Sequence, residues 1–448
     1  MFRLYTIDVL LHALIAWRLL PDQTSAIAFT ATAVWLIASA ILIPFALTAR
    51  RITRQPLSDR LALTGLLALG SFSSLLVLTI VRDVALLGVA GMNALFTLGV
   101  STPVLQSSSA AAVPILAALF TLIGFVNARR RARVRSVDVP IADLPAALHG
   151  FTIAQISDLH VGPTIKRAYV DAIVDVVNEL KVDMIAVTGD LVDGSVRQLA
   201  HHTQPMSRLQ ARHGTYFVTG NHEYYSGAAA WVAELRRLGV RVLMNEHVVL
   251  AHGGASVVVA GVTDYSAHHF DHAQRSDPVA ALAGAPAGAG VKLLLAHQPR
   301  SATAAASAGF DLQLSGHTHG GQFFPWNFFV RLQQPFTAGL HRLGELWVYT
   351  SRGTGYWGPP KRLGAPSEIT HLRLVPAVVG WFQIYLNLNT ETQRNGGPQR
   401  KDRDVDNWDD GEPYAEHSNE TMTARSIIFQ SRVFLCVPRC PLCLCVEV

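Results

Sequence analysis

Five short polar motifs occur in a fixed order in the middle of this chain, and each follows a short apolar run. The motifs are SDLH (Ser157–His160), GD (Gly189–Asp190), GNHE (Gly220–Glu223), the single His297 and SGHTHGG (Ser315–Gly321). The preceding runs FTIAQI, MIAVT, TYFVT, KLLLA and DLQL are rich in aliphatic and β-branched residues, which predicts buried strands. We therefore expect five strands that present oxygen and imidazole ligands at one common edge of a sheet.

The motifs supply two aspartates, one asparagine and four histidines, and they contain no sulfur ligand. These residues are Asp158, His160, Asp190, Asn221, His297, His317 and His319. Such a donor set suits borderline or hard divalent ions such as Mn²⁺, Fe²⁺, Zn²⁺ or Co²⁺. Seven ligands are too many for one tetrahedral site, so they predict two ions that share a bridging carboxylate.

The order of the motifs resembles that of the calcineurin-like metallophosphoesterases: D-x-H, GD, GNH(D/E), a single His and GH-x-H. The resemblance covers about Phe151–Leu374, and all five motifs match without a substitution. It implies an α/β fold in which a β-sandwich is flanked by helices, and it implies that His222 is the general acid. It also implies a first metal bound by Asp158, His160, Asp190 and His319, and a second bound by Asp190, Asn221, His297 and His317, with Asp190 bridging.

The charge of such a site favours a phosphate substrate. Two divalent ions and two ligand carboxylates leave a charge of about +2, and ions roughly 3.5–4 Å apart can clamp the attacking and leaving oxygens of an in-line displacement. A metal-bridging hydroxide is the expected nucleophile, because coordination lowers the pKa of bound water to roughly 7. We therefore predict a metal-dependent phosphoric ester hydrolase that cleaves a phosphomonoester, phosphodiester or pyrophosphate bond.

Two further residues are candidates for the site. Asp193 lies three residues after Asp190, as in phosphatases where the later aspartate orients the catalytic histidine, so we assign it to His222; a turn or helix-cap aspartate is the alternative. The motif continues with Gly194-Ser195, where the superfamily's phosphoprotein phosphatases carry a phosphate-binding arginine, and this disfavours a phosphoprotein substrate. Arg352 follows the run ELWVYT and is a weaker candidate for substrate binding, with ordinary turn chemistry as the alternative.

The N-terminal region has the composition of membrane helices. Only 15% of the residues in the whole chain are charged, against about 25% in soluble proteins. Ala26–Leu47, Leu61–Val81 and Ala110–Val126 carry no charge, and a bilayer core of about 30 Å requires about 20 such residues. Leu4–Leu20 is a fourth candidate span, and Val84–Leu105 either re-enters the membrane or merges with a neighbouring span. We therefore predict a multi-pass region of about four helices.

Two arginine clusters determine the predicted orientation. The first contains Arg50, Arg51, Arg54 and Arg60, and the second contains Arg129, Arg130, Arg131, Arg133 and Arg135. The positive-inside rule places both clusters in the cytoplasm, together with the catalytic domain that follows. An independent crossing by Val84–Leu105 would instead place the domain outside. Because the basic charge lies beside the membrane spans, where it suits anionic headgroups, no nucleic-acid partner is expected.

These features divide the chain into four predicted regions. They are a transmembrane region (1–127), a basic juxtamembrane linker (128–149), a catalytic domain (150–376) and a C-terminal tail (377–448). The tail is polar and aperiodic over 394–425, which predicts disorder. It also holds all four cysteines, in a spacing that matches no common zinc site.

The sequence as a whole predicts a membrane-anchored, dinuclear-metal phosphohydrolase of the cell membrane. Its expected partners are the lipid bilayer and a phosphorylated substrate, lipid-linked substrates included, and its oligomeric state is left open. One alternative is a phosphodiesterase that acts on soluble nucleotides or nucleic acid. Another is a membrane sensor or interaction protein with a vestigial metal site, but the complete ligand set and the intact His222 argue against it.

Overall fold

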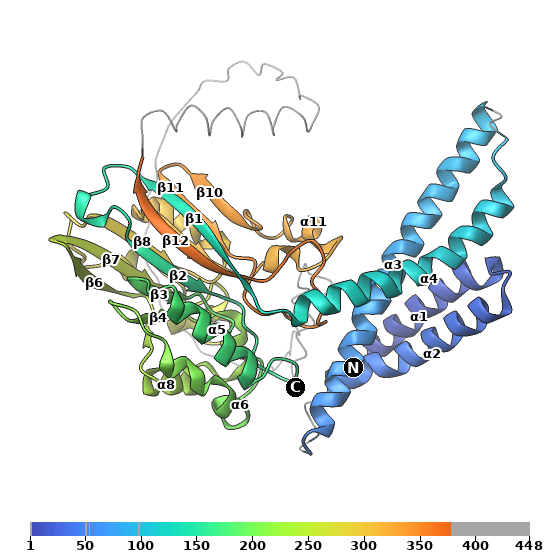
Figure 1. Cartoon of the computed structure of the whole chain (residues 1–448), viewed down its shortest axis with the longest axis horizontal. Coiled ribbons are helices and arrows are strands. Elements are labelled where there is room, and N and C mark those ends of the chain that lie inside the picture. Colours follow the sequence, from blue (N-terminus) through green and yellow to red (C-terminus); the bar gives the residue numbers. More distant parts are fainter. Residues whose placement is uncertain (1, 50–51, 53, 97–98, 378–448) are drawn as a thin grey trace, which may run out of the picture. The chain divides into compact units, whose positions relative to one another are not determined.

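Four long apolar helices form the N-terminal region of the computed structural model, which describes residues 2–49, 52, 54–96 and 99–377 (Figure 1). The helices are α1 (Phe2–Leu19), α2 (Ala26–Thr48), α3 (Leu57–Phe96) and α4 (Thr102–Arg129). Each is long and apolar enough to cross a membrane, in agreement with the predicted number. Val84–Leu105 merges with its neighbours, because its first part continues α3 and its last part begins α4. Gly99, with a φ of 67°, and Pro103 in the first turn of α4 separate the two helices.

A cluster of charged side chains joins α1, α3 and α4. Arg82 is only 5% exposed and pairs with Asp22 and Asp83. Arg18 binds Asp83 through Nε at 2.8 Å, and Arg82 also donates to the Gln106 carbonyl at 3.1 Å. Two cations and two anions therefore neutralise one another, as charged groups among apolar helices must.

Two six-stranded sheets form the domain that follows the four helices, which the sequence predicts to be catalytic. The strand order is β1-β12-β2-β3-β4-β5 in the first sheet and β10-β11-β9-β8-β7-β6 in the second. The bounds are β1 (Arg133–Ile141), β2 (Thr152–Ile156), β3 (Met184–Val187), β4 (Thr215–Phe217), β5 (Arg241–Val242), β6 (Glu246–His252), β7 (Ala255–Gly261), β8 (Val291–Leu295), β9 (Leu312–Ser315), β10 (Gly339–Leu343), β11 (Leu346–Thr350) and β12 (Glu368–Pro376). Neighbours are parallel from β2 to β5 and from β7 through β8 and β9 to β11. The predicted α/β sandwich flanked by helices is confirmed.

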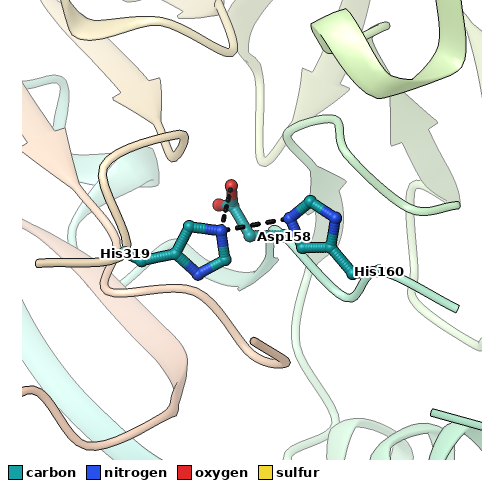
Figure 2. A group of neighbouring side chains, drawn as sticks. All are labelled: Asp158, His160 and His319. Carbon is teal, nitrogen blue, oxygen red and sulfur yellow. Dashed lines mark hydrogen bonds and ion pairs between the residues drawn. The ribbon is translucent and has the colours of Figure 1, made fainter. Parts of the chain in front are cut away.

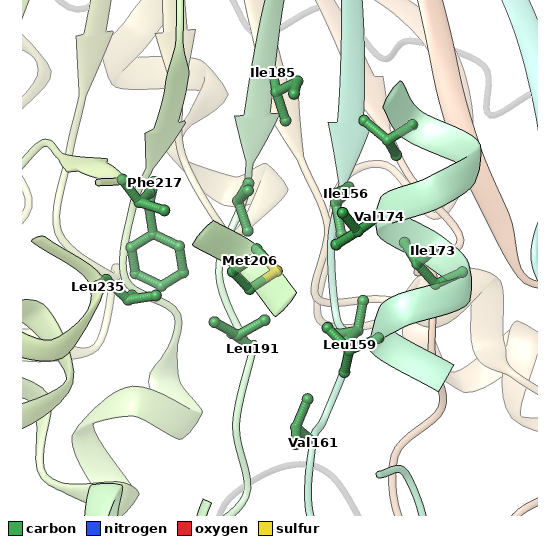
Figure 3. Close-up of a cluster of buried hydrophobic side chains, with 14 of the residues drawn as sticks. Ile156, Leu159, Val161, Ile173, Val174, Ile185, Leu191, Met206, Phe217 and Leu235 are labelled. Carbon is green, nitrogen blue, oxygen red and sulfur yellow. The ribbon is translucent and has the colours of Figure 1, made fainter. Parts of the chain in front are cut away.

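Helices cover the outer face of the first sheet (Figure 1). They are α5 (Arg167–Glu179), α6 (Val196–Thr203) and α8 (Ala228–Arg237). Helix α5 buries Val170, Ile173, Val174 and Val177, the i, i+3, i+4, i+7 spacing of an amphipathic helix. Figure 3 shows Val174 beside Ile156 of β2 in this core. The second sheet shares a hydrophobic core with α9 (Pro278–Leu282) and α10 (Ala302–Ala308).

A buried amide joins the two sheets near the ends of their central strands. Gln155 of β2 is fully buried and donates to the Ser315 carbonyl of β9 at 2.9 Å. The same amide nitrogen donates to Thr188 Oγ1, directly after β3, at 2.9 Å. Burial strengthens such bonds and makes their loss costly, so they fix the relative position of three strand ends.

The middle of the predicted juxtamembrane linker is in fact a strand of the first sheet. β1 pairs in parallel with β12 along its whole length, from Arg133 opposite Glu368 to Ile141 opposite Pro376. The linker prediction for 128–149 was therefore wrong for this segment, because the arginines at its start obscured the alternating burial of Val139 and Ile141. The predicted tail lies outside the described residues except for Ala377, which donates to the Ile141 carbonyl at 3.0 Å.

Removal of β1 is expected to destabilise the catalytic domain. Val139 and Ile141 are 0% and 3% exposed, and each buried aliphatic side chain stabilises a fold by about 1.5–3 kcal/mol. A fragment of residues 142–377 should therefore melt at a lower temperature than a fragment of residues 132–377 in thermal unfolding followed by circular dichroism. Equal melting temperatures would show that β1 adds nothing to the stability of the sheet.

Candidate metal centre

The seven predicted ligands follow the ends of five strands, as expected, but the strands belong to two sheets. The first sheet contributes Asp158 and His160 after β2, Asp190 after β3 and Asn221 after β4; the second contributes His297 after β8 and His317 and His319 after β9. The expectation of one common sheet edge was therefore wrong. The ligands converge from both layers of the sandwich, which a periodicity argument on single strands does not reveal.

The first group contains Asp158, His160 and His319, all of them buried (Figure 2). His160 Nε2 lies 3.1 Å from His319 Nε2, and His319 Nε2 lies 3.5 Å from Asp158 Oδ1. Figure 2 shows the two imidazoles facing one another with the carboxylate between them. Two ring nitrogens and a carboxylate oxygen that point at one place form a candidate cation site.

The second group contains Asp190, His297 and His317. His297 Nε2 lies 3.1 Å from Asp190 Oδ2 and 3.2 Å from His317 Nδ1. His297 Nδ1 lies 2.7 Å from the Thr188 carbonyl, and a proton donated there leaves the Nε2 lone pair free for a metal. Asn221 Oδ1 is buried and has no hydrogen-bond partner in the described part of the chain. A buried oxygen of this kind needs a partner, so the donor set fits a cation.

Asp190, a member of the second group, also lies near the first group. Its Oδ2 atom is 3.1 Å from His297 Nε2 and 3.8 Å from His160 Nε2. The predicted division into two ligand sets that share Asp190 is therefore compatible with the geometry. The individual ligand roles stay predictions.

Asp193 binds two histidines rather than one. Its Oδ1 atom lies 2.6 Å from His222 Nδ1, the contact expected from the sequence, and 3.1 Å from His160 Nδ1, a contact that was not expected. With Nδ1 donating to Asp193, the Nε2 atom of His222 is directed inward, 3.9 Å from Asp190 Oδ2. Asp193 is thus placed to orient both a predicted metal ligand and the predicted general acid.

The backbone at the predicted ligands is strained. Nine non-glycine residues in the described chain have positive φ, and five of them are predicted ligands: Asp158, His160, Asp190, His317 and His319, with φ from 51° to 69°. A left-handed conformation is uncommon for residues other than glycine, and such strain concentrates at functional sites. The left-handed conformation of these residues, and not only that of the glycines in the motifs, therefore sets the directions of the ligand side chains.

Burial and neighbouring charges set the protonation of the site. Burial and the charge of His297 lower the pKa of His317 to about 3, and burial with the Arg362 guanidinium lowers the pKa of His319 well below its usual value. Both imidazoles are therefore neutral at physiological pH, which is the form that binds a metal. Burial opposes ionisation of Asp190, but His297 and His222 hold the pKa of this carboxyl well below its usual value.

Two residues with structural roles at the site were not identified from the sequence. Glu223 is fully buried and accepts hydrogen bonds from the backbone nitrogens of Asp190 (3.0 Å), Leu191 (2.8 Å) and Gly220 (2.7 Å). It thereby connects the GD and GNHE motifs. Its position in the GNHE motif was the one sequence feature that could have indicated this role. Arg362, 1% exposed, lies with Nη2 3.1 Å from His319 Nδ1 and donates to the His319 carbonyl at 3.0 Å. Nothing in its sequence context distinguishes it from a surface arginine.

Arg352, the weaker substrate-binding candidate, is engaged by a buried carboxylate. Its Nη1 atom lies 3.2 Å from Glu368 Oε2, and its backbone nitrogen donates to Glu368 Oε1 at 3.2 Å. Glu368 also accepts a hydrogen bond from the Tyr349 hydroxyl at 2.8 Å. The guanidinium therefore has a structural partner, and its role in substrate binding stays a prediction.

Two aromatic rings lie beside His222. The Trp357 ring centroid lies 5.7 Å from that of His222, and the Tyr225 centroid lies 5.3 Å from it. Phe270, which is 51% exposed, lies 5.5 Å from Tyr225. A group that leaves next to His222 would therefore meet an apolar surface.

Comparisons with known proteins agree with this geometry. Residues 151–321 match the family model "Calcineurin-like phosphoesterase". A bovine "Transmembrane protein with metallophosphoesterase domain" (Bos taurus) is 41% identical over an alignment of 281 positions that covers 59% of this chain and 63% of that protein. A protein of the same name from Danio rerio is 36% identical, over 59% of this chain and 62% of that protein. The chain thus matches just under two thirds of the length of these relatives.

A shorter bacterial relative is matched over most of its length. An "Uncharacterized metallophosphoesterase" from Aquifex aeolicus is 33% identical over 239 residues, which are 53% of this chain and 89% of that protein. The similarity covers nearly the whole length of that metallophosphoesterase. The chain therefore belongs to the calcineurin-like metallophosphoesterases.

Proposed function

We propose that the chain is a membrane-anchored phosphoester hydrolase with a dinuclear metal centre. The observation that carries the proposal is the position of Asp190, whose Oδ2 atom lies within 4 Å of a histidine from each ligand group. The orphan oxygen of Asn221 adds support, since it gives the second group a further ligand and has no other partner among the described residues. The substrate class is a phosphomonoester, phosphodiester or pyrophosphate.

Two divalent ions in this site would supply an activated water and would neutralise the phosphate charge. Asp158, His160 and His319 would hold the first ion, and Asn221, His297 and His317 would hold the second, with Asp190 shared. Mn²⁺, Fe²⁺ and Zn²⁺ suit these nitrogen and oxygen donors. Asp193 and Glu223 would position the ligands without binding a metal, because their carboxylates are already engaged by histidines and by backbone nitrogens.

His222 is proposed as the general acid on the basis of its geometry. Its Nδ1 atom is held by Asp193 at 2.6 Å, which fixes the ring and leaves Nε2 to face the site. A proton on Nε2 would be donated to the leaving oxygen of the substrate as the phosphorus–oxygen bond breaks. Asn221 and His222 lie in the first turn of α7 (Asn221–Ser226), where adjacent side chains point in different directions, so the two residues serve separate roles.

The reconstituted full-length protein is expected to bind two equivalents of Mn²⁺ per chain and to hydrolyse bis(4-nitrophenyl) phosphate. Removal of the ions with a chelator should abolish turnover and lower the melting temperature, because ions that bind only the folded state stabilise it. Mn²⁺ should restore both properties. Two bound ions without hydrolysis of any phosphoester would favour the sensor or interaction protein, and one bound ion would contradict the dinuclear centre.

The proposed orientation is multi-pass with the catalytic domain in the cytoplasm. If all four helices cross, the α2–α3 connection and the segment after α4 lie on one side, and these are the segments that contain the two arginine clusters. A cysteine at Gln55 should therefore resist a membrane-impermeant maleimide in intact cells, whereas a cysteine at Ser101 should react. The unsubstituted chain supplies the background from its own cysteines, and the reverse labelling pattern would place the domain outside.

A further inference from the structure

An exposed aromatic segment begins three residues after His319, the last predicted metal ligand. The segment Gln322–Leu332, sequence QFFPWNFFVRL, contains α11 (Trp326–Val330). Four of its apolar side chains are exposed: Phe324 by 50%, Phe328 by 58%, Phe329 by 48% and Leu332 by 81%. Large apolar side chains gathered on one short surface segment mark an interaction site rather than ordinary surface variation. We refer to Gln322–Leu332 as the aromatic segment.

The aromatic segment is attached firmly to the candidate metal centre. It begins one residue after the turn His319–Gly321, and Asn327 packs so closely on Gly321 that a side chain there would have no room. Gln322 donates to the Trp357 carbonyl at 2.8 Å and accepts from the Trp357 backbone nitrogen at 2.9 Å. The Trp357 ring in turn lies beside His222. Whatever covers the segment is therefore held next to the proposed leaving-group side of the site.

The aromatic segment is also attached to a helix of membrane-spanning length. The Trp326 indole nitrogen donates to Ser73 Oγ of α3 at 3.1 Å. The neighbouring Pro359–Lys361 turn contacts the same helix, where Lys361 Nζ bonds to the Gly70 carbonyl at 3.0 Å and to Ser74 Oγ. Because α3 is one of the four helices long and apolar enough to cross a bilayer, the exposed rings lie close to membrane-embedded structure.

The charge around the aromatic segment suits an anionic lipid surface. Residues 322–344 contain no aspartate or glutamate, and the exposed Arg331 lies between the rings and Leu332. The 352–363 segment also lacks acidic residues. Its Lys361 and Arg362 are buried and its Arg352 is paired with Glu368, so Arg331 supplies the exposed positive charge next to the rings. Exposed aromatic and aliphatic side chains beside an exposed arginine, with no acidic residue in the segment, are typical of elements that lie in the membrane interface.

We propose that the aromatic segment inserts into the bilayer surface and that the substrate is a membrane lipid with a phosphoester headgroup. This inference rests on the proposed hydrolase function and names its substrate class. The headgroup phosphate would bind at the two ligand groups, and the apolar part of the lipid would lie along the rings. Hydrolysis breaks the bond between phosphorus and the lipid oxygen; water supplies the new oxygen on phosphorus, and the proton on His222 passes to the lipid oxygen.

Photocrosslinking tests the insertion without relying on activity. The full-length chain carrying Phe328→p-benzoylphenylalanine is reconstituted in vesicles of phosphatidylcholine and phosphatidylglycerol and irradiated. A phospholipid adduct is expected at position 328. The matched control is Val279→p-benzoylphenylalanine, at a site on α9 that is 66% exposed, and it should give none. A crosslink at 328 to a second copy, or to another part of the chain, would overturn the proposal.

Hydrolysis assays test the substrate class and separate it from the proposed function. Vesicles containing phosphatidic acid probe a lipid phosphomonoester, vesicles containing phosphatidylglycerol probe a phosphodiester, and bis(4-nitrophenyl) phosphate serves as the soluble probe. The double variant Phe328→Ser/Phe329→Ser should lower the ratio of lipid to soluble turnover at least tenfold, whereas Val249→Ser/Val279→Ser should leave the ratio unchanged. Hydrolysis of the soluble ester with no lipid hydrolysis would overturn the lipid inference alone. Absence of both activities in the metal-loaded wild type would overturn the proposed function as well.

Discussion

Replacement of Asp190 by asparagine is expected to lower both bound metal and turnover, more than replacement of any other single ligand. Asp190 Oδ2 lies 3.1 Å and 3.8 Å from histidines of the two groups, so its carboxylate can serve both ions. An amide has nearly the same shape but no negative charge, and its nitrogen cannot bind a cation. Metal ions stabilise the transition state by several kcal/mol, which corresponds to a loss of roughly 10³-fold or more in turnover.

The measurement is metal content by inductively coupled plasma mass spectrometry, together with the turnover of a soluble phosphodiester. Asp311→Asn is a matched control, because Asp311 is a partly buried carboxylate that accepts a hydrogen bond from the Lys292 backbone nitrogen at 2.7 Å and belongs to neither ligand group. It should retain two ions and near-normal turnover. An Asp190→Asn chain that retained two equivalents and normal turnover would contradict the bridging role.

The ligand set was accessible to sequence reasoning because each ligand is tied to a strand end by chain connectivity. Asp158 and His160 follow an apolar run directly, and the structure brings them to His319, which lies 159 residues away from His160. The family resemblance carried by the order of the motifs predicted that meeting. The sandwich was implied by family resemblance, whereas the assignment of β2 and β9 to different sheets depends on long-range pairing that no local pattern encodes.

Other features could not be predicted because their cause lies in tertiary contacts. β1 follows three consecutive arginines, Arg129–Arg131, so its sequence resembles the basic flank of a membrane span. In the structure, however, it pairs with β12. Arg362 resembles a surface residue in sequence, but the turn that contains it is buried and directs its guanidinium to His319. Tertiary burial of this kind overrides local composition, and it also explains why Lys361 is only 2% exposed to solvent.

The double role of Asp193 changes what a mutational cycle should show. The sequence suggested a residue that serves only His222, in which case a double substitution would be little worse than the loss of His222. The contact between Asp193 and His160 Nδ1 at 3.1 Å means that Asp193→Asn should also disturb a predicted ligand of the first ion. The coupling between Asp193 and His222 should therefore be incomplete, with part of the Asp193 effect surviving in the double variant.

Replacement of His222 by glutamine is expected to retain both ions and to lower turnover by roughly 10²–10⁴-fold, the range for loss of general acid–base catalysis. His222 Nε2 faces the site at 3.9 Å from Asp190 Oδ2, while Nδ1 is occupied by Asp193, so the ring is placed for proton transfer. The defect should be smaller for substrates with good leaving groups such as 4-nitrophenolate, because they need little protonation as the bond breaks. Turnover is compared across aryl phosphodiesters of graded leaving-group pKa.

The comparison that decides the role of His222 is the slope of turnover against leaving-group pKa, measured with metal content in the same samples. His222→Gln should give a steeper slope than the wild type and unchanged metal content. His202→Gln is a suitable control, because its ring lies in α6 and belongs to none of the candidate metal groups in the described residues. Loss of an ion in His222→Gln would make His222 a metal ligand. Parallel slopes with intact metal would assign it to phosphate binding, because only the loss of a proton donor makes the turnover defect depend on how much protonation the departing oxygen requires.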